Sequence, residues 1–175
     1  MTMPEQHGLI IVFTGTGKGK TSAALGIALR AAGHGQKTAI IQFLKGGQRS
    51  GEQLVGNVPL VEVHAFGPGF FKPGDDPEPH KSAAEKGWRM AQDIILSGGA
   101  HVLVLDEISH AINFGFLPST VVLETIRRKK PGLHIILTGR NMPPDLMKIA
   151  DIATEMKEIR HIYQTGHPAV KGIDY

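Results

Sequence analysis

The chain has 175 residues, of which 41% are hydrophobic, enough for one sizeable core but short for two, so we expect a single domain over residues 1–175. It contains no cysteine, which excludes disulfide scaffolds, thiolate metal sites and cysteine nucleophiles and favours a cytoplasmic location. No segment reaches the roughly 20 apolar residues of a membrane span, and the basic residues are spread among acids, so we expect neither a membrane nor a nucleic-acid partner.

Six short apolar runs are expected to form strands, because such runs are typical of strands buried on both faces of a parallel sheet. Helical patterns alternate with them: residues 21–32 are dense in alanine and leucine, and the apolar residues of 79–96 fall on one face. This alternation predicts a three-layer α/β domain with a mostly parallel sheet of about six strands. The expected strands cover residues 8–13, 38–43, 58–64, 101–105, 133–138 and 153–162.

A glycine-dense segment, Thr14-Gly-Thr-Gly-Lys-Gly-Lys-Thr21, joins the first expected strand to the first helix. In this position it predicts a phosphate-binding P-loop, because successive backbone N–H groups can converge on phosphate oxygens at a helix N-terminus. Thr14 stands where the usual motif has glycine, so the loop is a variant. A plain strand-to-helix turn is the weaker alternative. The sequence thus predicts a P-loop NTPase-like (RecA-like) fold, with nucleotide held by Gly15, Thr16, Gly17, Lys18, Gly19, Lys20 and Thr21.

Two carboxylates, Asp106 and Glu107, end the expected strand over residues 101–105. Parallel sheets gather functional groups at such strand ends, where acids can hold Mg²⁺ beside a P-loop. We expect Thr21 and one or both acids to bind the metal, and Lys20 to neutralise phosphate charge. The alternative is that the acids only cap the following helix.

Other side chains leave two readings open. Arg140 ends another expected strand and could reach phosphate or form a surface ion pair. Arg30 could reach the nucleotide base or stay solvated. Phe70 and Phe71 lie in the long loop expected over 67–78, where they could cover a flat ligand or pin the loop to the core. The nine histidines form no clear metal-binding pattern, so we assign none of them to a metal.

Several further segments narrow the interpretation. Together with the P-loop they resemble the P-loop-type ATP:corrinoid adenosyltransferases, and the resemblance spans nearly the whole chain. A P-loop alone is shared by many unrelated proteins, whereas this ordered set is specific. The segments that carry the resemblance are residues 11–21, 30–35, 41–46, 104–107, 137–141, 150–151 and 172–175.

The resemblance implies transfer of the 5′-deoxyadenosyl group of ATP to the Co(I) centre of a reduced corrinoid, with release of triphosphate, in adenosylcobalamin biosynthesis or salvage. It implies Lys20, Thr21 and Glu107 as catalytic residues, and Mg²⁺ on Thr21, Asp106 and Glu107. From its place on the helix, Arg30 is our further candidate for an ATP contact. Family members use an aromatic loop to keep the lower axial ligand off the cobalt. Phe70 matches that aromatic position, whereas Lys72 replaces a second aromatic.

The expected partners are ATP and corrinoid as substrates, an external electron donor that reduces the cobalt, and a second copy of the chain in a homodimer. Some relatives carry a longer segment before the first strand, so we expect the chain's own loops, a second subunit or a weaker lid to shield the substrate. A small kinase or NTPase would also use the P-loop and the acid pair. A nucleotide-dependent corrinoid carrier without turnover is the third possibility.

Overall fold

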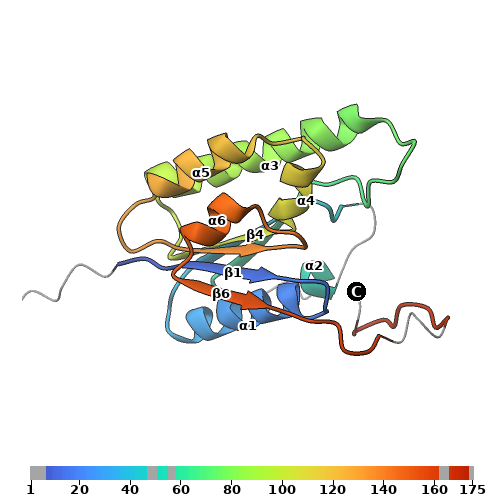
Figure 1. The fold of residues 1–175 in the computed structure, drawn as a ribbon. Helices are drawn as coiled ribbons and strands as arrows, with labels where there is room; N and C mark the ends of the chain where they lie inside the picture. The colour runs from blue at the N-terminus through green and yellow to red at the C-terminus, as the bar shows by residue number, and fades with distance from the viewer. Residues whose placement is uncertain (1–6, 47–50, 55–57, 162–165, 174–175) are drawn as a thin grey trace, which may run out of the picture.

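The computed structural model describes residues 7–46, 51–54, 58–161 and 166–173. Six strands form one sheet in the order β3-β2-β4-β5-β1-β6, and every pair of neighbours is parallel (Figure 1). The predicted mostly parallel sheet of about six strands is therefore confirmed. The strands are β1 Ile10–Thr14, β2 Thr38–Gln42, β3 Val61–Ala65, β4 Val102–Asp106, β5 His134–Thr138 and β6 Ile152–Glu155.

Helices cover both faces of the sheet, as Figure 1 shows: α1 lies on one face, and α3, α4, α5 and α6 lie on the other. Side chains of β1 alternate between two cores. Ile10 and Val12 join the core under α3, whereas Ile11 and Phe13 join the core under α1. The three-layer α/β arrangement is thus confirmed. The helices are α1 Lys20–Gly33, α2 Gly51–Leu54, α3 Pro77–Ser97, α4 Ile108–Asn113, α5 Ser119–Arg127 and α6 Pro144–Lys148.

Two strand predictions were wrong at their ends. The last strand was expected over 153–162 but ends at Glu155, and residues 156–161 continue without strand pairing; Ile162 lies outside the described residues. The third strand begins at Val61 rather than at residue 58, because Leu60 has a left-handed φ of 67° that breaks the extended chain. Both strands lie at the edges of the sheet, where weaker burial leaves the apolar pattern less distinct.

The strand order brings the functional segments together. β5 lies between β1 and β4, so the loop after β1, the acids after β4 and the turn after β5 meet at one carboxyl edge of the sheet. β2 pairs with the side of β4 that faces away from β5, and in this pairing Gln42 is the register partner of Asp106.

Candidate active site

The loop between β1 and α1 needs glycine at two positions. Gly15 has a φ of +97° and Gly19 a φ of +105°, both in the left-handed region. A Cβ atom on Gly15 would lie 2.4 Å from the carbonyl oxygen of Met156. The N–H of Gly17 donates to the same oxygen at 2.7 Å. Met156, directly after β6, therefore packs against the loop between β1 and α1 and stabilises it, a contact that the sequence did not predict.

Lys20 is buried at the start of α1 and turns its ammonium back into the loop. Its Nζ donates to the carbonyl oxygens of Gly15 at 2.9 Å and Gly17 at 2.6 Å. Burial lowers the pKa of Lys20, although the nearby charge of Glu107 opposes the shift. The protein thus holds a partly desolvated ammonium where the sequence predicted phosphate to bind.

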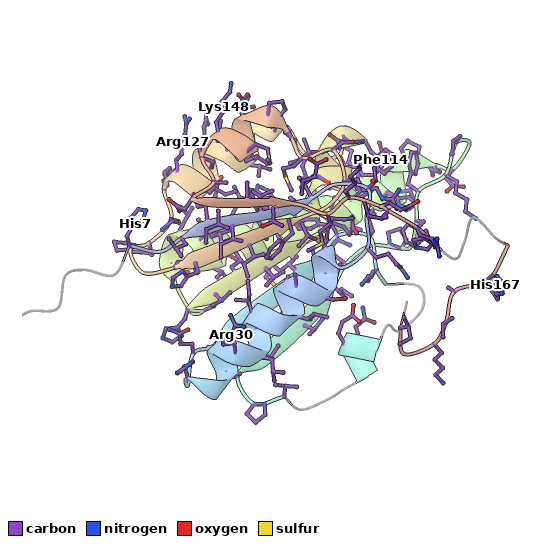
Figure 2. All side chains as sticks on the ribbon, turned by 60° about the horizontal axis from the view of Figure 1, so that its bottom comes forward. His7, Arg30, Phe114, Arg127, Lys148 and His167 are labelled. Carbon is purple, nitrogen blue, oxygen red and sulfur yellow. The ribbon has the colours of Figure 1, made fainter. Side chains whose placement is uncertain are left out.

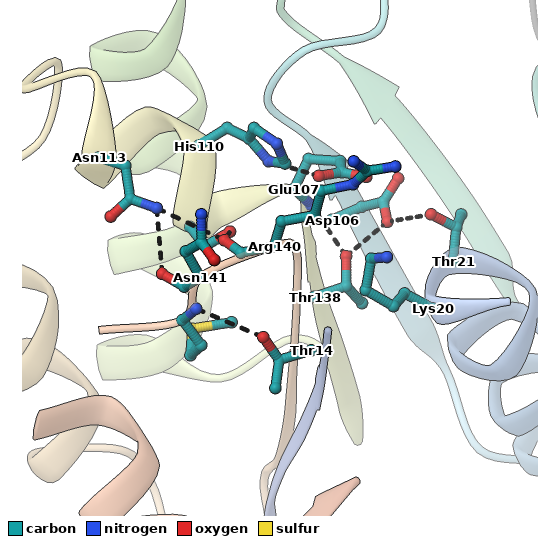
Figure 3. A network of polar contacts seen from close by, with 12 residues as sticks. Thr14, Lys20, Thr21, Asp106, Glu107, His110, Asn113, Thr138, Arg140 and Asn141 are labelled. Atoms are coloured by element: carbon teal, nitrogen blue, oxygen red, sulfur yellow. Dashed lines mark hydrogen bonds and ion pairs between the residues drawn. The ribbon is translucent and has the colours of Figure 1, made fainter. Parts of the chain in front are cut away.

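Asp106 is completely buried at the end of β4, and both of its oxygens accept hydrogen bonds. Figure 3 shows the two threonine hydroxyls that reach one of these oxygens. The hydroxyls of Thr21 and Thr138 each donate to Oδ1 at 2.8 Å. The side-chain amide of Gln42 donates to Oδ2 at 3.2 Å, and the ammonium of Lys45 lies 3.8 Å from the same oxygen. Burial raises the pKa of Asp106, and the nearby charge of Lys45 opposes the shift.

Glu107 immediately precedes α4 and has a backbone conformation that is uncommon outside glycine, with a φ of 62°. Its N–H donates to the Thr138 hydroxyl at 2.9 Å, and its carboxylate contacts Nδ1 of His110 at 2.5 Å. Burial opposes ionisation of Glu107, but its close contact with His110 and the charges of His110 and Lys20 hold its pKa below its usual value. The side chain makes no capping bond to α4, so helix capping does not explain this acid.

The turn after β5 packs tightly against α4. A Cβ atom on Gly139, whose φ is +136°, would lie 2.0 Å from the Ser109 hydroxyl. That hydroxyl donates to the Arg140 carbonyl at 2.7 Å, and the Asn113 amide donates to the Asn141 carbonyl at 3.0 Å. The Arg140 side chain is exposed and lies close enough to Lys20 to contribute to the lowering of its pKa. The turn therefore holds a guanidinium near the loop lysine.

The arrangement fits Mg²⁺ together with a polyphosphate. In the described residues there is no group of three or more His, Asp or Glu side chains that could hold a metal alone. Mg²⁺, however, is usually bound by one or two carboxylates plus substrate phosphates. Because the Thr21 hydroxyl donates its proton to Asp106, its lone pairs are free for a cation.

Comparisons with known proteins add an independent observation. A family model described as ATP:corrinoid adenosyltransferase BtuR/CobO/CobP matches residues 6–175. The corrinoid adenosyltransferase of Escherichia coli K12 is 33% identical over 171 residues, covering 98% of this chain and 87% of that protein. The chain belongs to this family.

Other relatives agree with the assignment. The corrinoid adenosyltransferase of a Sinorhizobium species is 34% identical over 183 residues, covering 99% of this chain and 83% of that protein. Corrinoid adenosyltransferase CobA of Salmonella typhimurium LT2 is 33% identical and covers 98% of this chain and 87% of that protein. Among solved structures, a KaiC-like protein of Pyrococcus horikoshii has a TM-score of 0.47 at 17% identity, covering 88% of this chain and 74% of that one.

In this adenosyltransferase the aromatic loop has one exposed and one anchored ring. The side chain of Phe70 is 76% exposed. Phe71 instead packs edge-on against the rings of Phe114 and Phe116, with centroids 5.2 and 5.3 Å apart. Phe71 therefore pins the loop, as one of the two interpretations of this pair expected, whereas contact of the exposed Phe70 ring with a ligand stays a prediction.

Arg30 is not part of the cluster at the sheet edge. It projects from the end of α1 and is exposed (Figure 2). It lies about 15 Å along the helix axis from Lys20, at about 1.5 Å per residue. A contact with the base of ATP would require the nucleotide to extend along α1, and this role stays a prediction.

Sequence reasoning missed four residues that complete the site. Thr138 and Gln42 end apolar strands with a polar side chain, a signal that the parallel-sheet rule could have used. His110 stands three residues after Glu107, the spacing at which helical side chains meet. Lys45 gives no local signal, because its contact with Asp106 depends on the pairing of β2 with β4.

Among the described helices, none is both long and apolar enough to span a membrane.

Proposed function

We propose that this chain transfers the 5′-deoxyadenosyl group of ATP to the Co(I) centre of a reduced corrinoid and releases triphosphate, in adenosylcobalamin biosynthesis or salvage. The cobalt electron pair forms the Co–C5′ bond, the C5′–O bond breaks, and its electrons leave on triphosphate. The observation that carries the proposal is a buried lysine inside a glycine-dense loop, in a member of the ATP:corrinoid adenosyltransferase family.

The loop is proposed to bind the triphosphate, because that group carries the developing negative charge of the leaving group. Lys20 supplies a positive charge in a water-poor place, where electrostatic stabilisation is strongest. Gly15, Thr16, Gly17, Lys18 and Gly19 supply backbone donors around it. The N–H of Gly17 is paired with Met156, so phosphate binding at this donor requires that bond to open.

Thr21, Asp106 and Glu107 are proposed to hold Mg²⁺. Hard oxygen ligands from a hydroxyl and two carboxylates at one sheet edge support this assignment. The ion would supply positive charge to the leaving triphosphate. Thr138 keeps the acids in place, since its hydroxyl donates to Asp106 and accepts from the N–H of Glu107.

Phe70 is proposed to contact the corrinoid and to keep its lower face free of an axial ligand. Its exposure and the anchoring of the loop through Phe71 support this role. Lys72 follows in place of a second aromatic side chain, and its N–H donates to Asp75 at 2.7 Å. In this chain the loop therefore offers one free ring to the ligand.

The proposal also includes a single domain over residues 1–175, an external electron donor, a homodimer and a cytoplasmic location. One continuous sheet supports the single domain. Sedimentation at several protein concentrations tests the dimer, and a dependence of corrinoid binding on concentration would link it to the active site.

The decisive assay supplies ATP, Mg²⁺ and a chemically reduced corrinoid. The expected products are a light-sensitive Co–C species and inorganic triphosphate in equal amounts. ADP and phosphate would instead indicate a kinase or NTPase, and corrinoid binding without turnover would indicate a carrier.

A further inference from the structure

Gln42 is a fully buried polar residue that has no role in the proposed binding of triphosphate, Mg²⁺ or corrinoid. It ends β2, and all the polar groups of its amide are paired. Its Nε2 donates to Asp106 Oδ2 at 3.2 Å and to Glu52 Oε1 at 2.8 Å. Its Oε1 accepts from Nε2 of Gln53 at 2.8 Å. The amide thus joins the buried carboxylate of β4 to the short helix α2.

Lys45 completes this group. Its ammonium lies 2.7 Å from Glu52 Oε1 and 3.8 Å from Asp106 Oδ2. Burial would raise the pKa of Glu52, but hydrogen bonds from Lys45, the backbone and Gln42, together with the charge of Lys45, lower it to about 2. Although burial would lower it, the pKa of Lys45 is raised in turn by Asp106 and Glu52, so both partners are charged at neutral pH. Glu52 therefore holds Lys45 at a distance longer than a hydrogen bond from Asp106.

The two oxygens of Asp106 face different kinds of donor. Threonine hydroxyls bond Oδ1, whereas the neutral amide of Gln42 bonds Oδ2. The terminal torsion of an aspartate is broad, so donors on both oxygens are needed to fix the carboxylate plane. A neutral donor can do this without competing with a metal cation, whereas an ammonium at the same oxygen would compete.

We propose that Gln42 is a positioning residue that orients the Asp106 carboxylate for Mg²⁺, and that Glu52 restrains Lys45 from displacing the metal. The inference rests on the proposed metal role of Asp106. Residues that orient metal ligands in this way change metal affinity by about 10- to 100-fold when they are removed.

The first test compares two glutamine variants. Gln42→Met keeps the length and apolar volume but donates no hydrogen bond, whereas Gln53→Met leaves both donor bonds of Gln42 intact. Mn²⁺ binding to the enzyme–ATP complex is titrated by electron paramagnetic resonance, and ATP binding is measured by calorimetry in EDTA. We expect Gln42→Met to weaken Mn²⁺ binding by about tenfold while metal-free ATP binding stays within about twofold. Gln53→Met should leave both within about twofold.

The second test leaves Gln42 itself in place and retains a side-chain oxygen at position 52 as its acceptor, which keeps the inference falsifiable if Gln42→Met does not fold. Glu52→Gln frees Lys45 to pair with Asp106 and should weaken Mn²⁺ binding severalfold. Glu52→Gln combined with Lys45→Met should restore it.

Three results would overturn the inference: unchanged Mn²⁺ affinity in Gln42→Met, an equal loss of metal-free ATP binding, or no recovery in the double variant. Failure of the proposed function shows separately, as wild-type enzyme that binds Mn²⁺·ATP but forms no Co–C product.

Discussion

The carboxyl edge of the sheet, where Lys20, Thr21 and Asp106 lie, is buried and closely hydrogen-bonded, whereas the aromatic loop is exposed and held at few points. At the edge, side chains from α1, β2 and β5 bond one buried carboxylate, Asp106. The aromatic loop, residues 67–76, is largely exposed and is held by the packing of Phe71 and by the close approach of Gly67 to Phe43 and Leu44. Charge stabilisation needs groups that are fixed in advance, whereas contact with a broad macrocycle tolerates adjustment.

The largest effect is expected at the edge. Lys20→Ala should lower kcat/KM by about 10²- to 10³-fold with chemically reduced corrinoid, because a buried positive charge on the leaving triphosphate is lost. The fold, followed by circular dichroism, should persist. Lys148→Ala removes an exposed lysine of α6 and should leave the rate unchanged. An unchanged rate in Lys20→Ala at saturating ATP would contradict the assignment.

Glycine substitutions compare the rigidity of the two regions. Gly139→Ala should destabilise the fold by about 2 to 3 kcal/mol, because Gly139 has a left-handed φ and the added Cβ would also clash with the Ser109 hydroxyl. Gly74→Ala in the aromatic loop is also left-handed but meets nothing within 4 Å, so it should cost about 1 kcal/mol.

Urea unfolding measures both variants. Gly26→Ala, inside α1 with open space around it, is the control and should stabilise by about 0.5 to 1 kcal/mol. Equal losses in Gly139→Ala and Gly74→Ala would remove the distinction between the two regions.

The two phenylalanines separate anchoring from ligand contact. Phe70→Ala should slow adenosylation about tenfold when the cobalt must be reduced in the assay, but not with corrinoid already reduced to Co(I); this magnitude corresponds to about 1.4 kcal/mol. Phe71→Ala, unlike Phe70→Ala, should lower thermal stability, because the Phe71 ring packs against the rings of Phe114 and Phe116. Equal losses for Phe70→Ala in both assays would argue against a role in cobalt reduction.

Arg30 should give the smallest effect. An exposed charge contributes less than about 1 kcal/mol, so Arg30→Ala should raise KM for ATP about twofold and leave kcat unchanged. A large fall in kcat would mean that the nucleotide extends along α1 and contacts Arg30 directly.

The sequence predicted what depends on local pattern. Apolar runs located the four central strands to within two residues, and the long helices α1 and α3 were found from their composition and apolar face. Helices α2, α5 and α6 were missed, because a helix of four to nine residues has too few turns to show a distinct apolar period. A helix after the acids, where α4 lies, was considered only as something that they could cap. Thr21, Asp106 and Glu107 were predicted to converge because they follow parallel strands, and the structure brings them together.

What could not be predicted depends on strand order and packing. Gln42 reaches Asp106 because β2 pairs with β4, and Thr138 reaches it because β5 separates β4 from β1. Phe70 and Phe71 are identical neighbours in sequence, and only the position of the Phe114 and Phe116 rings distinguishes them. The contact of Met156 with the P-loop likewise follows from the pairing of β6 with β1.

The central claim is that C5′ of ATP, and not its terminal phosphorus, is the reacting centre at the loop that holds Lys20. Adenosylation with ATP labelled by ³²P at the γ position and chemically reduced corrinoid tests this most directly. The label should appear in intact triphosphate, in step with the light-sensitive Co–C product. Label in free phosphate, with ADP as the other product, would contradict it.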